Sequence, residues 1–194
     1  EKLTRARRRS DEAIELINNV LKISKLRIED SFIKEEVDIA SILARAIKSA
    51  KVNAEAKGVK LSIINHRKEK HTIEGDPLLI QIALSNIISN AIKYNNMDGI
   101  VEIEVDEDKD NLIIKVSDNG VGIPKEETEK IFNDFYRASN IKHGSVEGSG
   151  LGLSVVKQIV ERHNGTINVQ SPSHLSTNKY PGTCVKITLP CIKK

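Results

Sequence analysis

Three short motifs in a fixed order constrain this chain more than any other feature of its sequence. The stretch Asn86–Tyr94 spaces polar side chains at intervals of three and four residues within an apolar helical pattern. Asp118–Ile123 places a carboxylate and two glycines at the end of an alternating strand pattern, and Gly148–Gly152 puts three glycines before another apolar helical pattern. Together they predict a polar-striped helix, a strand ending in a carboxylate and a glycine loop that opens a helix, which is typical of nucleotide binding.

The composition narrows the class of protein. Aromatic residues make up 3% of the 194 residues, with no Trp, so Ile, Leu and Val must fill the core. That scarcity and a net charge of only +3 disfavour nucleic-acid binding. Cys184 and Cys191 lack metal-ligand spacing and fit a reducing compartment.

The location is inferred from hydropathy. No apolar run reaches the ~18 residues of a spanning helix, so we expect these residues to be cytoplasmic and to make no direct membrane contact. The first residue is Glu, so we expect a piece of a longer protein, which can carry a membrane anchor elsewhere.

Hydrophobic periodicity predicts an α+β fold. Residues 1–30 carry a heptad pattern without Gly or Pro, which predicts a long helix that packs against other helices. Residues 34–38 form a predicted polar connector, and further helices are predicted from Ile39 to Gly58, after Pro77, and over 151–163. Alternation predicts strands at 61–65, 71–74, 100–106, 112–117, 166–171 and 183–189. The expected architecture is a two-layer α/β sandwich, a mixed sheet with about three helices on one face, preceded by the long bundle helix.

The polar stripe of the first motif offers a defined chemistry. Asn86, Asn90 and Lys93 or Tyr94 fall on one helix face, so two carboxamides and an ammonium lie in line. Carboxamide oxygens are ligands for a hard cation, and an ammonium is a donor to phosphate. A solvated polar face is the alternative for this stripe taken alone.

The glycine motifs have alternatives of their own. Period two aims Asp118 along the strand face that its predecessors bury, where an amine donor of a base would suit it. The alternative is an ordinary Asp-Asn-Gly turn. Gly148–Gly152 also resembles a dinucleotide fingerprint, but a polar loop precedes it instead of a buried strand, so dinucleotide binding is disfavoured.

In this order, the motifs resemble the catalytic, ATP-binding domain of sensor histidine kinases, within the superfamily of gyrase B, Hsp90 and MutL. Asn86–Tyr94 is similar to the N box of that family and Asp118–Ile123 to its first glycine box. Phe132–Arg137 resembles the F box of the ATP lid, Gly148–Leu153 the second glycine box, and Pro181–Thr183 a further glycine motif. The resemblance covers residues 35–190. Residues 1–33 resemble the second helix of the dimerisation and phosphotransfer hairpin, and 34–194 the catalytic domain.

The resemblance implies roles for individual residues. Asn86, Lys93 and Arg137 would be catalytic, and Asn90, helped by Asn86, would ligate Mg²⁺. Asp118 would accept a hydrogen bond from the adenine amine, and residues from about Lys125 to Ser149 would form a mobile lid. The implied ATP-binding residues are Asn90, Lys93, Tyr94, Asp118, Gly120, Gly122, Ile123, Tyr136, Arg137, Gly148, Ser149, Gly150, Leu151, Gly152 and Thr183.

Two features of the sequence refine the implied activity. The superfamily's ATP-hydrolysing members carry a Glu where this chain has Asn86, and a carboxamide cannot act as a general base. The resemblance therefore implies a protein-histidine kinase rather than an ATPase, with ATP and Mg²⁺ as cofactors. Its partners would be a response-regulator receiver domain and a second copy that dimerises through the hairpin helices.

No histidine has the sequence setting of a phosphoacceptor, so we expect the acceptor to lie outside this chain. The five candidates are His66, His71, His143, His163 and His174, of which His163 reads as a helix-terminal residue favourable to the helix dipole. Two alternatives remain open: a serine/threonine kinase of the anti-sigma type, and a non-catalytic, ATP-gated interaction module.

Overall fold

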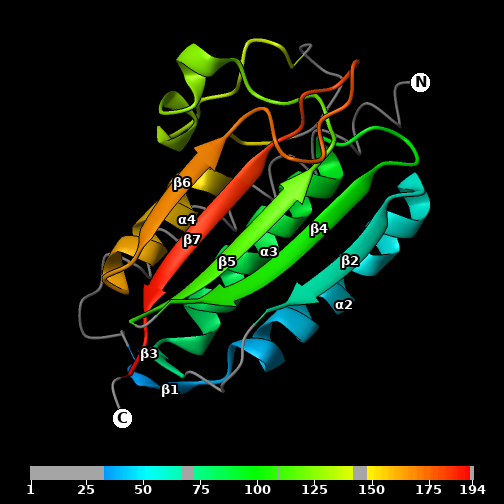
Figure 1. Cartoon of the computed structure of the whole chain (residues 1–194). Coiled ribbons are helices and arrows are strands. Elements are labelled where there is room, and N and C mark those ends of the chain that lie inside the picture. The colour runs from blue at the N-terminus through cyan, green and yellow to red at the C-terminus, as the bar shows by residue number, and fades with distance from the viewer. Residues whose placement is uncertain (1–32, 67–71, 109, 142–147, 193–194) are drawn as a thin grey trace, which may run out of the picture.

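A computed structural model describes residues 33–66, 72–108, 110–141 and 148–192. They form a five-stranded mixed sheet with three α-helices on one face (Figure 1). The strand order is β2 (Lys60–Asn65), β4 (Ile100–Glu107), β5 (Asn111–Asp118), β7 (Cys184–Pro190) and β6 (Thr166–Gln170). β2 is parallel to β4, and all other neighbours are antiparallel. The predicted two-layer fold is confirmed. The long helix predicted over residues 1–30 lies outside the described residues.

The three helices begin and end where local sequence signals place them. Asp38 caps α2 (Ile39–Lys57), which ends at Gly58 in the left-handed conformation. Asp76 caps α3 (Pro77–Lys93) by accepting hydrogen bonds from two backbone N–H groups of its first turn. α4 (Gly152–Arg162) begins at the last glycine of the Gly148–Gly152 motif.

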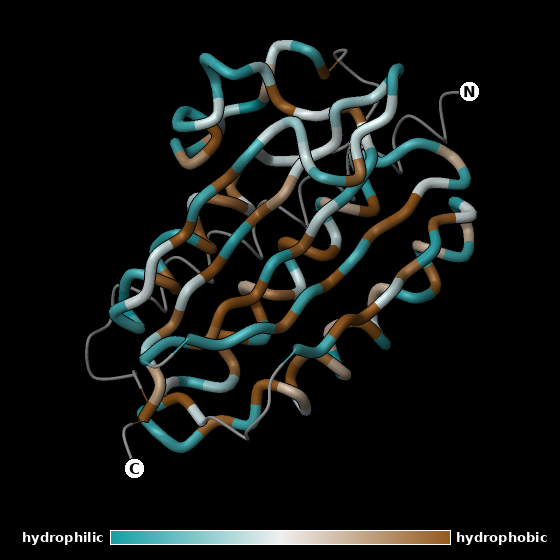
Figure 2. Tube along the Cα trace, in the orientation of Figure 1, coloured by the Kyte–Doolittle hydropathy of each residue, from teal (hydrophilic) through white to brown (hydrophobic). Residues whose placement is uncertain are grey.

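The core lies between the helices and the sheet and consists almost wholly of aliphatic side chains (Figure 2). Along β5, Leu112, Ile114 and Val116 point into it and are at most 1% exposed. Asp118 continues the same alternation and is 6% exposed. The period-two argument therefore places this carboxylate correctly, at the buried end of a central strand.

A second, two-stranded sheet corrects one prediction. Residues 34–38, predicted as a polar connector, contain strand β1 (Glu35–Val37), which pairs with β3 (Ile73–Gly75). An isolated bridge joins Ile73 to Cys191. The chain that enters the domain is thus tied to the segment just before α3. A three-residue strand without apolar alternation leaves no periodic signal, which is why the sequence did not reveal it.

The segment between β5 and α4 contains short helical turns that the sequence did not predict. It contains two 3₁₀ turns, η2 (Lys125–Glu127) and η3 (Lys130–Phe132), within its described part. Within the described residues, none of the helices has the length and apolar character needed to span a bilayer.

His163 differs from its predicted role. It does cap the C-terminal end of α4, but it is only 4% exposed, and burial lowers its pKa below the ordinary 6.5. Its Nε2 accepts a hydrogen bond from the backbone N–H of Asp76 (2.9 Å), and its Nδ1 lies 2.7 Å from the carbonyl oxygen of Ile159. This pattern requires the neutral ring with the proton on Nδ1. His163 is therefore a neutral link between α4 and the start of α3, and not a cation on a helix dipole.

We predict that this link makes the fold sensitive to mild acid. A pKa below that of the unfolded chain gives stability that is present above pH 6.5 and is lost as the pH falls. His163→Ala should lower the free energy of unfolding at pH 7.5 by about 1–3 kcal/mol, because the N–H of Asp76 is left buried without its acceptor. Urea unfolding at pH 7.5 and 5.5 measures both effects. His163→Gln should reduce the pH dependence. His66→Gln, at an exposed side chain, controls for the loss of a histidine.

Candidate functional site

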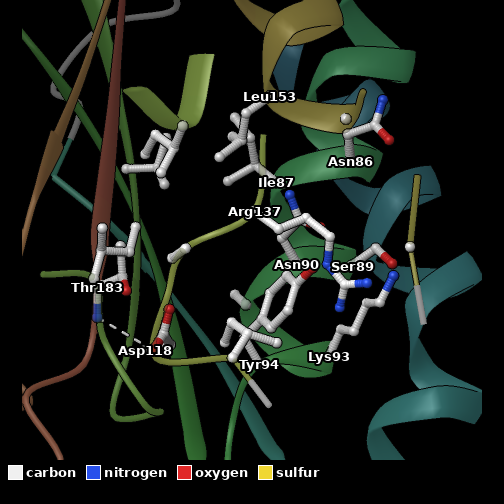
Figure 3. A pocket seen from close by; sticks show the side chains of 18 of the residues that line it. Asn86, Ile87, Ser89, Asn90, Lys93, Tyr94, Asp118, Arg137, Leu153 and Thr183 are labelled. Carbon is white, nitrogen blue, oxygen red and sulfur yellow. Dashed lines mark hydrogen bonds between the residues drawn. The ribbon is translucent and has the colours of Figure 1, made fainter. Parts of the chain in front are cut away.

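A pocket opens at the end of the sheet where β5 terminates, between α3, residues 131–141 and the start of α4 (Figure 3). All but two of the predicted site residues line it. Those that do are Asn86, Asn90, Lys93, Tyr94, Asp118, Gly122, Ile123, Tyr136, Arg137, Gly148, Ser149, Gly150, Gly152 and Thr183. Segments more than sixty residues apart in sequence thus converge on one cavity.

The α3 wall carries the polar stripe. Asn86 donates from Nδ2 to the carbonyl oxygen of Ile82 (3.0 Å), so its Oδ1 remains as an acceptor. A Cβ built on Gly152 would lie 3.7 Å from that Oδ1 and 3.6 Å from Nδ2 of Asn90. The first residue of α4 therefore rests beside both carboxamides, and its lack of a side chain leaves them facing the pocket.

Cationic groups gather at the same side of the pocket. A Cβ on Gly148 would lie 2.7 Å from Nζ of Lys93, so that ammonium is next to the backbone of the glycine loop. The Arg137 side chain extends towards the region of Lys93 and Asn90 (Figure 3). Two cations that share one cavity with half-buried carboxamides form a site complementary to a polyanion.

Asp118 forms the opposite, deeply buried side of the pocket. Its Oδ1 accepts hydrogen bonds from the backbone N–H groups of Gly120 (2.8 Å) and Thr183 (3.2 Å). Burial raises the pKa of this carboxyl to about 6, although the two hydrogen bonds lower it. Both bonds use Oδ1, so Oδ2 is the oxygen available to an N–H donor of a ligand.

The two predicted residues that do not line the pocket, Gly120 and Leu151, pack behind its lining residues. A Cβ on Gly120 would collide with the carbonyl oxygen of Tyr94 and lie 2.8 Å from Cα of Asn95. Only glycine lets the turn after β5 approach the end of α3 this closely. Leu151 is 1% exposed and occupies the N-cap position of α4, where its apolar side chain packs into the interior.

Sequence reasoning missed two serines in the loop between β6 and β7, although it identified Pro181–Thr183 at the end of that loop. Ser173 Oγ donates to the carbonyl oxygen of Asp118 (2.7 Å) and Ser171 Oγ to that of Gly182 (2.7 Å). Ser171 also accepts from the N–H of Ile123 (3.1 Å). Both serines therefore fix the turn that carries Asp118. Their sequence context is that of any surface turn, so no local signal distinguishes them.

One carboxylate–histidine cluster lies away from the pocket. Within the described ranges, only Glu102, Glu104 and His174 place three possible metal ligands of the His, Cys, Asp and Glu types within 4.8 Å of one another. Both carboxylates already have partners: His174 Nε2 lies 2.7 Å from Glu102, and Lys115 Nζ lies 2.9 Å from Glu104. The cluster is a network of one salt bridge and one histidine–carboxylate contact on the face of the sheet opposite the helices.

Comparisons with known proteins agree with this geometry. The sequence model of the family described as "Histidine kinase-, DNA gyrase B-, and HSP90-like ATPase" matches residues 75–193. "Sensor protein kinase WalK" of Staphylococcus aureus is 34% identical over 97% of this chain, which covers 44% of that relative. The "Mycobacterial sensor histidine kinase MprB" structure superposes with a TM-score of 0.70 at 27% identity, over 84% of this chain and 100% of that one.

A further structural neighbour contains a bound ligand. "ShkA full-length in complex with AMPPNP" has a TM-score of 0.77 at 22% identity, covers 100% of this chain, and has 39% of its own length matched, which shows the shared fold. The chain spans less than half the length of the curated relatives that it matches.

We predict that Asp118 lowers the stability of the domain at neutral pH. Because its folded-state pKa is raised, its contribution to stability is full below the unfolded value of 3.8 and is lost as the pH rises through about 6. Asp118→Asn keeps an acceptor for Gly120 and Thr183 without the buried charge. It should raise the free energy of unfolding by about 1–3 kcal/mol at pH 8, since a difference of one in pKa between the folded and unfolded states corresponds to about 1.4 kcal/mol. Chemical denaturation near pH 4 should show little difference. A variant that is destabilised equally at both pH values would contradict this electrostatic account.

Proposed function

The chain belongs to the histidine kinase-, DNA gyrase B- and HSP90-like ATPase family, and on that premise we propose that it is the ATP-binding catalytic part of a sensor histidine kinase. Residues 34–194 would bind Mg·ATP, and residues 1–33 would be the second helix of a dimerisation and phosphotransfer hairpin. The γ-phosphoryl group would pass to a histidine outside this chain as ADP leaves, and then to an aspartate of a response regulator. In the longer protein, two copies would pair through the hairpin helices.

This proposal rests on the different chemical groups at the two sides of the pocket. A buried carboxylate lies on one side, and two carboxamides with two cations lie on the other. A ligand that suits both sides must join a planar group bearing an N–H donor to a polyanion. An adenine nucleotide has this form.

Asp118 would recognise the base. With a pKa of about 6 it is mainly ionised at pH 7.5, and an ionised carboxylate only accepts hydrogen bonds. The adenine amine would donate to Oδ2, while Gly120 and Thr183 hold Oδ1. Gly122, Ile123 and Tyr94 would surround the base and sugar.

The α3 stripe and the glycine loop would bind the triphosphate. Lys93 and Arg137 would pair with phosphate oxygens, and backbone N–H groups at Gly148–Gly152 would add donors at the start of α4. The donor set suits Mg²⁺, because Asn90 and Asn86 offer neutral oxygen ligands beside that phosphate site. Bound Mg²⁺ would supply charge neutralisation at the transferring phosphoryl group.

Asn86 would favour transfer to a protein side chain over transfer to water. Its carboxamide has no basic site at neutral pH, and its Nδ2 is engaged by the carbonyl oxygen of Ile82. No carboxylate stands at that position to activate water. The similarity to WalK likewise favours a histidine kinase over the anti-sigma type and the non-catalytic module.

We predict that the chain binds Mg·ADP and Mg·ATP, and that Asp118→Asn weakens the binding at least about tenfold at pH 7.5. A charge-assisted hydrogen bond is worth about 1.5–3 kcal/mol, and Asn offers only a neutral acceptor. Isothermal titration calorimetry measures the effect. Asp106→Asn, on β4 outside the pocket, is the matched control. Unchanged ADP affinity in a folded Asp118→Asn variant would refute the adenine assignment.

We predict that the chain alone neither phosphorylates itself nor releases phosphate at an appreciable rate. It should phosphorylate a separately added hairpin that carries an acceptor histidine. Asn86→Glu should raise ATP hydrolysis by about 10²-fold or more, since positioned general bases contribute about 10²–10⁴-fold.

Radiolabelled ATP tests both parts of this prediction. Asn86→Gln, which lengthens the side chain without adding a base, should hydrolyse no faster than the unmodified chain. Acid-labile label that accumulates on the unmodified chain would show that one of its own histidines is the acceptor. Rapid phosphate release by the unmodified chain would show that Asn86 does not prevent hydrolysis.

A further inference from the structure

We propose that Glu127 and Asn140 are positioning residues that hold residues 136–141 as a pre-formed wall of the nucleotide pocket. The nature of the ligand rests on the proposed function, whereas the anchoring itself is a property of the ligand-free chain. Tyr136, Arg137, Ala138 and Ile141 line the pocket. The two remaining residues of this segment, Ser139 and Asn140, attach it to the rest of the domain.

Glu127 anchors the segment at Ser139. It is a carboxylate at the end of η2, yet it is only 8% exposed. Its Oε2 accepts a hydrogen bond from the backbone N–H of Ser139 (2.8 Å). Hydrogen bonds from the Ser139 side chain and backbone, and a weaker contribution from the Tyr136 hydroxyl, hold the pKa of Glu127 below its ordinary value. One ionised carboxylate therefore bonds to two residues of the wall.

Asn140 anchors the same segment to the glycine turn. Its Nδ2 donates to the carbonyl oxygens of Gly122 (3.0 Å) and Val121 (3.3 Å). That turn follows directly from Asp118, which the N–H of Thr183 holds in place. The wall is thus fixed to the part of the domain that would recognise the base.

Residues 136–141 therefore contain two kinds of residue, those that line the pocket and those that anchor the segment. The side chains that line the pocket do not have to anchor the segment, because Ser139 and Asn140 on the same backbone make the anchoring contacts. Arg137 in particular has a long side chain whose useful position depends on its backbone. Pre-formed walls lower the ordering cost of binding. We therefore expect residues 136–141 to be ordered before nucleotide binds, within a lid whose mobility elsewhere stays a prediction.

Hydrogen exchange on the nucleotide-free chain tests the anchoring directly. The Ser139 amide should be protected in the wild type, and Glu127→Ala should increase its exchange rate by at least about tenfold. Asn140→Ala should increase exchange over residues 138–141, while amides of β5 keep their rates in both variants. Glu126→Ala, an exposed carboxylate in the same turn, is the matched control and should change neither. An unprotected Ser139 amide in the wild type, or unchanged exchange in Glu127→Ala, would overturn the proposal.

A double-mutant cycle on nucleotide affinity tests the function of the wall. Glu127→Ala and Asn140→Ala should each weaken binding of a non-hydrolysable Mg·ATP analogue about tenfold. The double variant should be little weaker than either single one, because both residues hold one segment. Glu127→Gln should recover part of the loss, since its carbonyl can still accept from Ser139, and it replaces Glu127→Ala if that variant fails to fold.

The experiments distinguish failure of the anchoring proposal from failure of the proposed function. Additive losses in the cycle would mean that the residues act independently, which would overturn the shared-wall proposal. A wild-type chain with a protected Ser139 amide but no affinity for the analogue would refute the proposed function and leave the anchoring intact.

Discussion

The buried carboxylate of Asp118 is the constraint on which the site depends. It ends a central strand, takes hydrogen bonds from Gly120 and Thr183 on one oxygen, and is 6% exposed. Burying a charge is costly unless it is partnered, so the surrounding backbone must be held with little freedom. The interlocking of the glycine turn, the end of α3 and the loop before β7 follows from this requirement. Gly120 permits the close approach, and Ser173 fixes the carbonyl group of Asp118 itself.

The opposite side of the pocket depends on how α3 packs against the aliphatic core. Bulky groups of α3 such as Ile87 and Ile88 pack inwards, which fixes the rotation of that helix and turns Asn86 and Asn90 towards α4. Because helix rotation is set by packing over the whole length of α3, the stripe is held more rigidly than residues on a loop would be. The two cations then lie across the cavity from the carboxylate, so the electrostatic field of the site runs along its length.

Much of the fold could be predicted because its signals are periodic. Period two located Asp118 on the buried face of β5, and period 3.6 with the Asp76–Pro77 start located α3 and its stripe. The features that could not be predicted depend on contacts between residues that are distant in sequence. β1 exists only because β3 pairs with it, and the neutral form of His163 is set by Asp76, which is far away in sequence. Ser171 and Glu127 look like ordinary loop residues until the fold brings their partners to them.

The residue at position 86 bears on why this site would transfer phosphate to a protein rather than hydrolyse ATP. Hydrolysis needs a base that holds a water molecule. Asn86 occupies the position beside the proposed phosphate site, and its Nδ2 is already bonded to its own helix. The cations on the same side of the pocket, Lys93 and Arg137, would position and neutralise the phosphates, and a protonated cation cannot remove a proton from water. Phosphoryl transfer depends mainly on positioning and charge stabilisation, so a nucleophile supplied by another protein segment would complete the site. The polar stripe of α3 would thus bind and orient the triphosphate, and among its described residues none supplies a carboxylate to activate water.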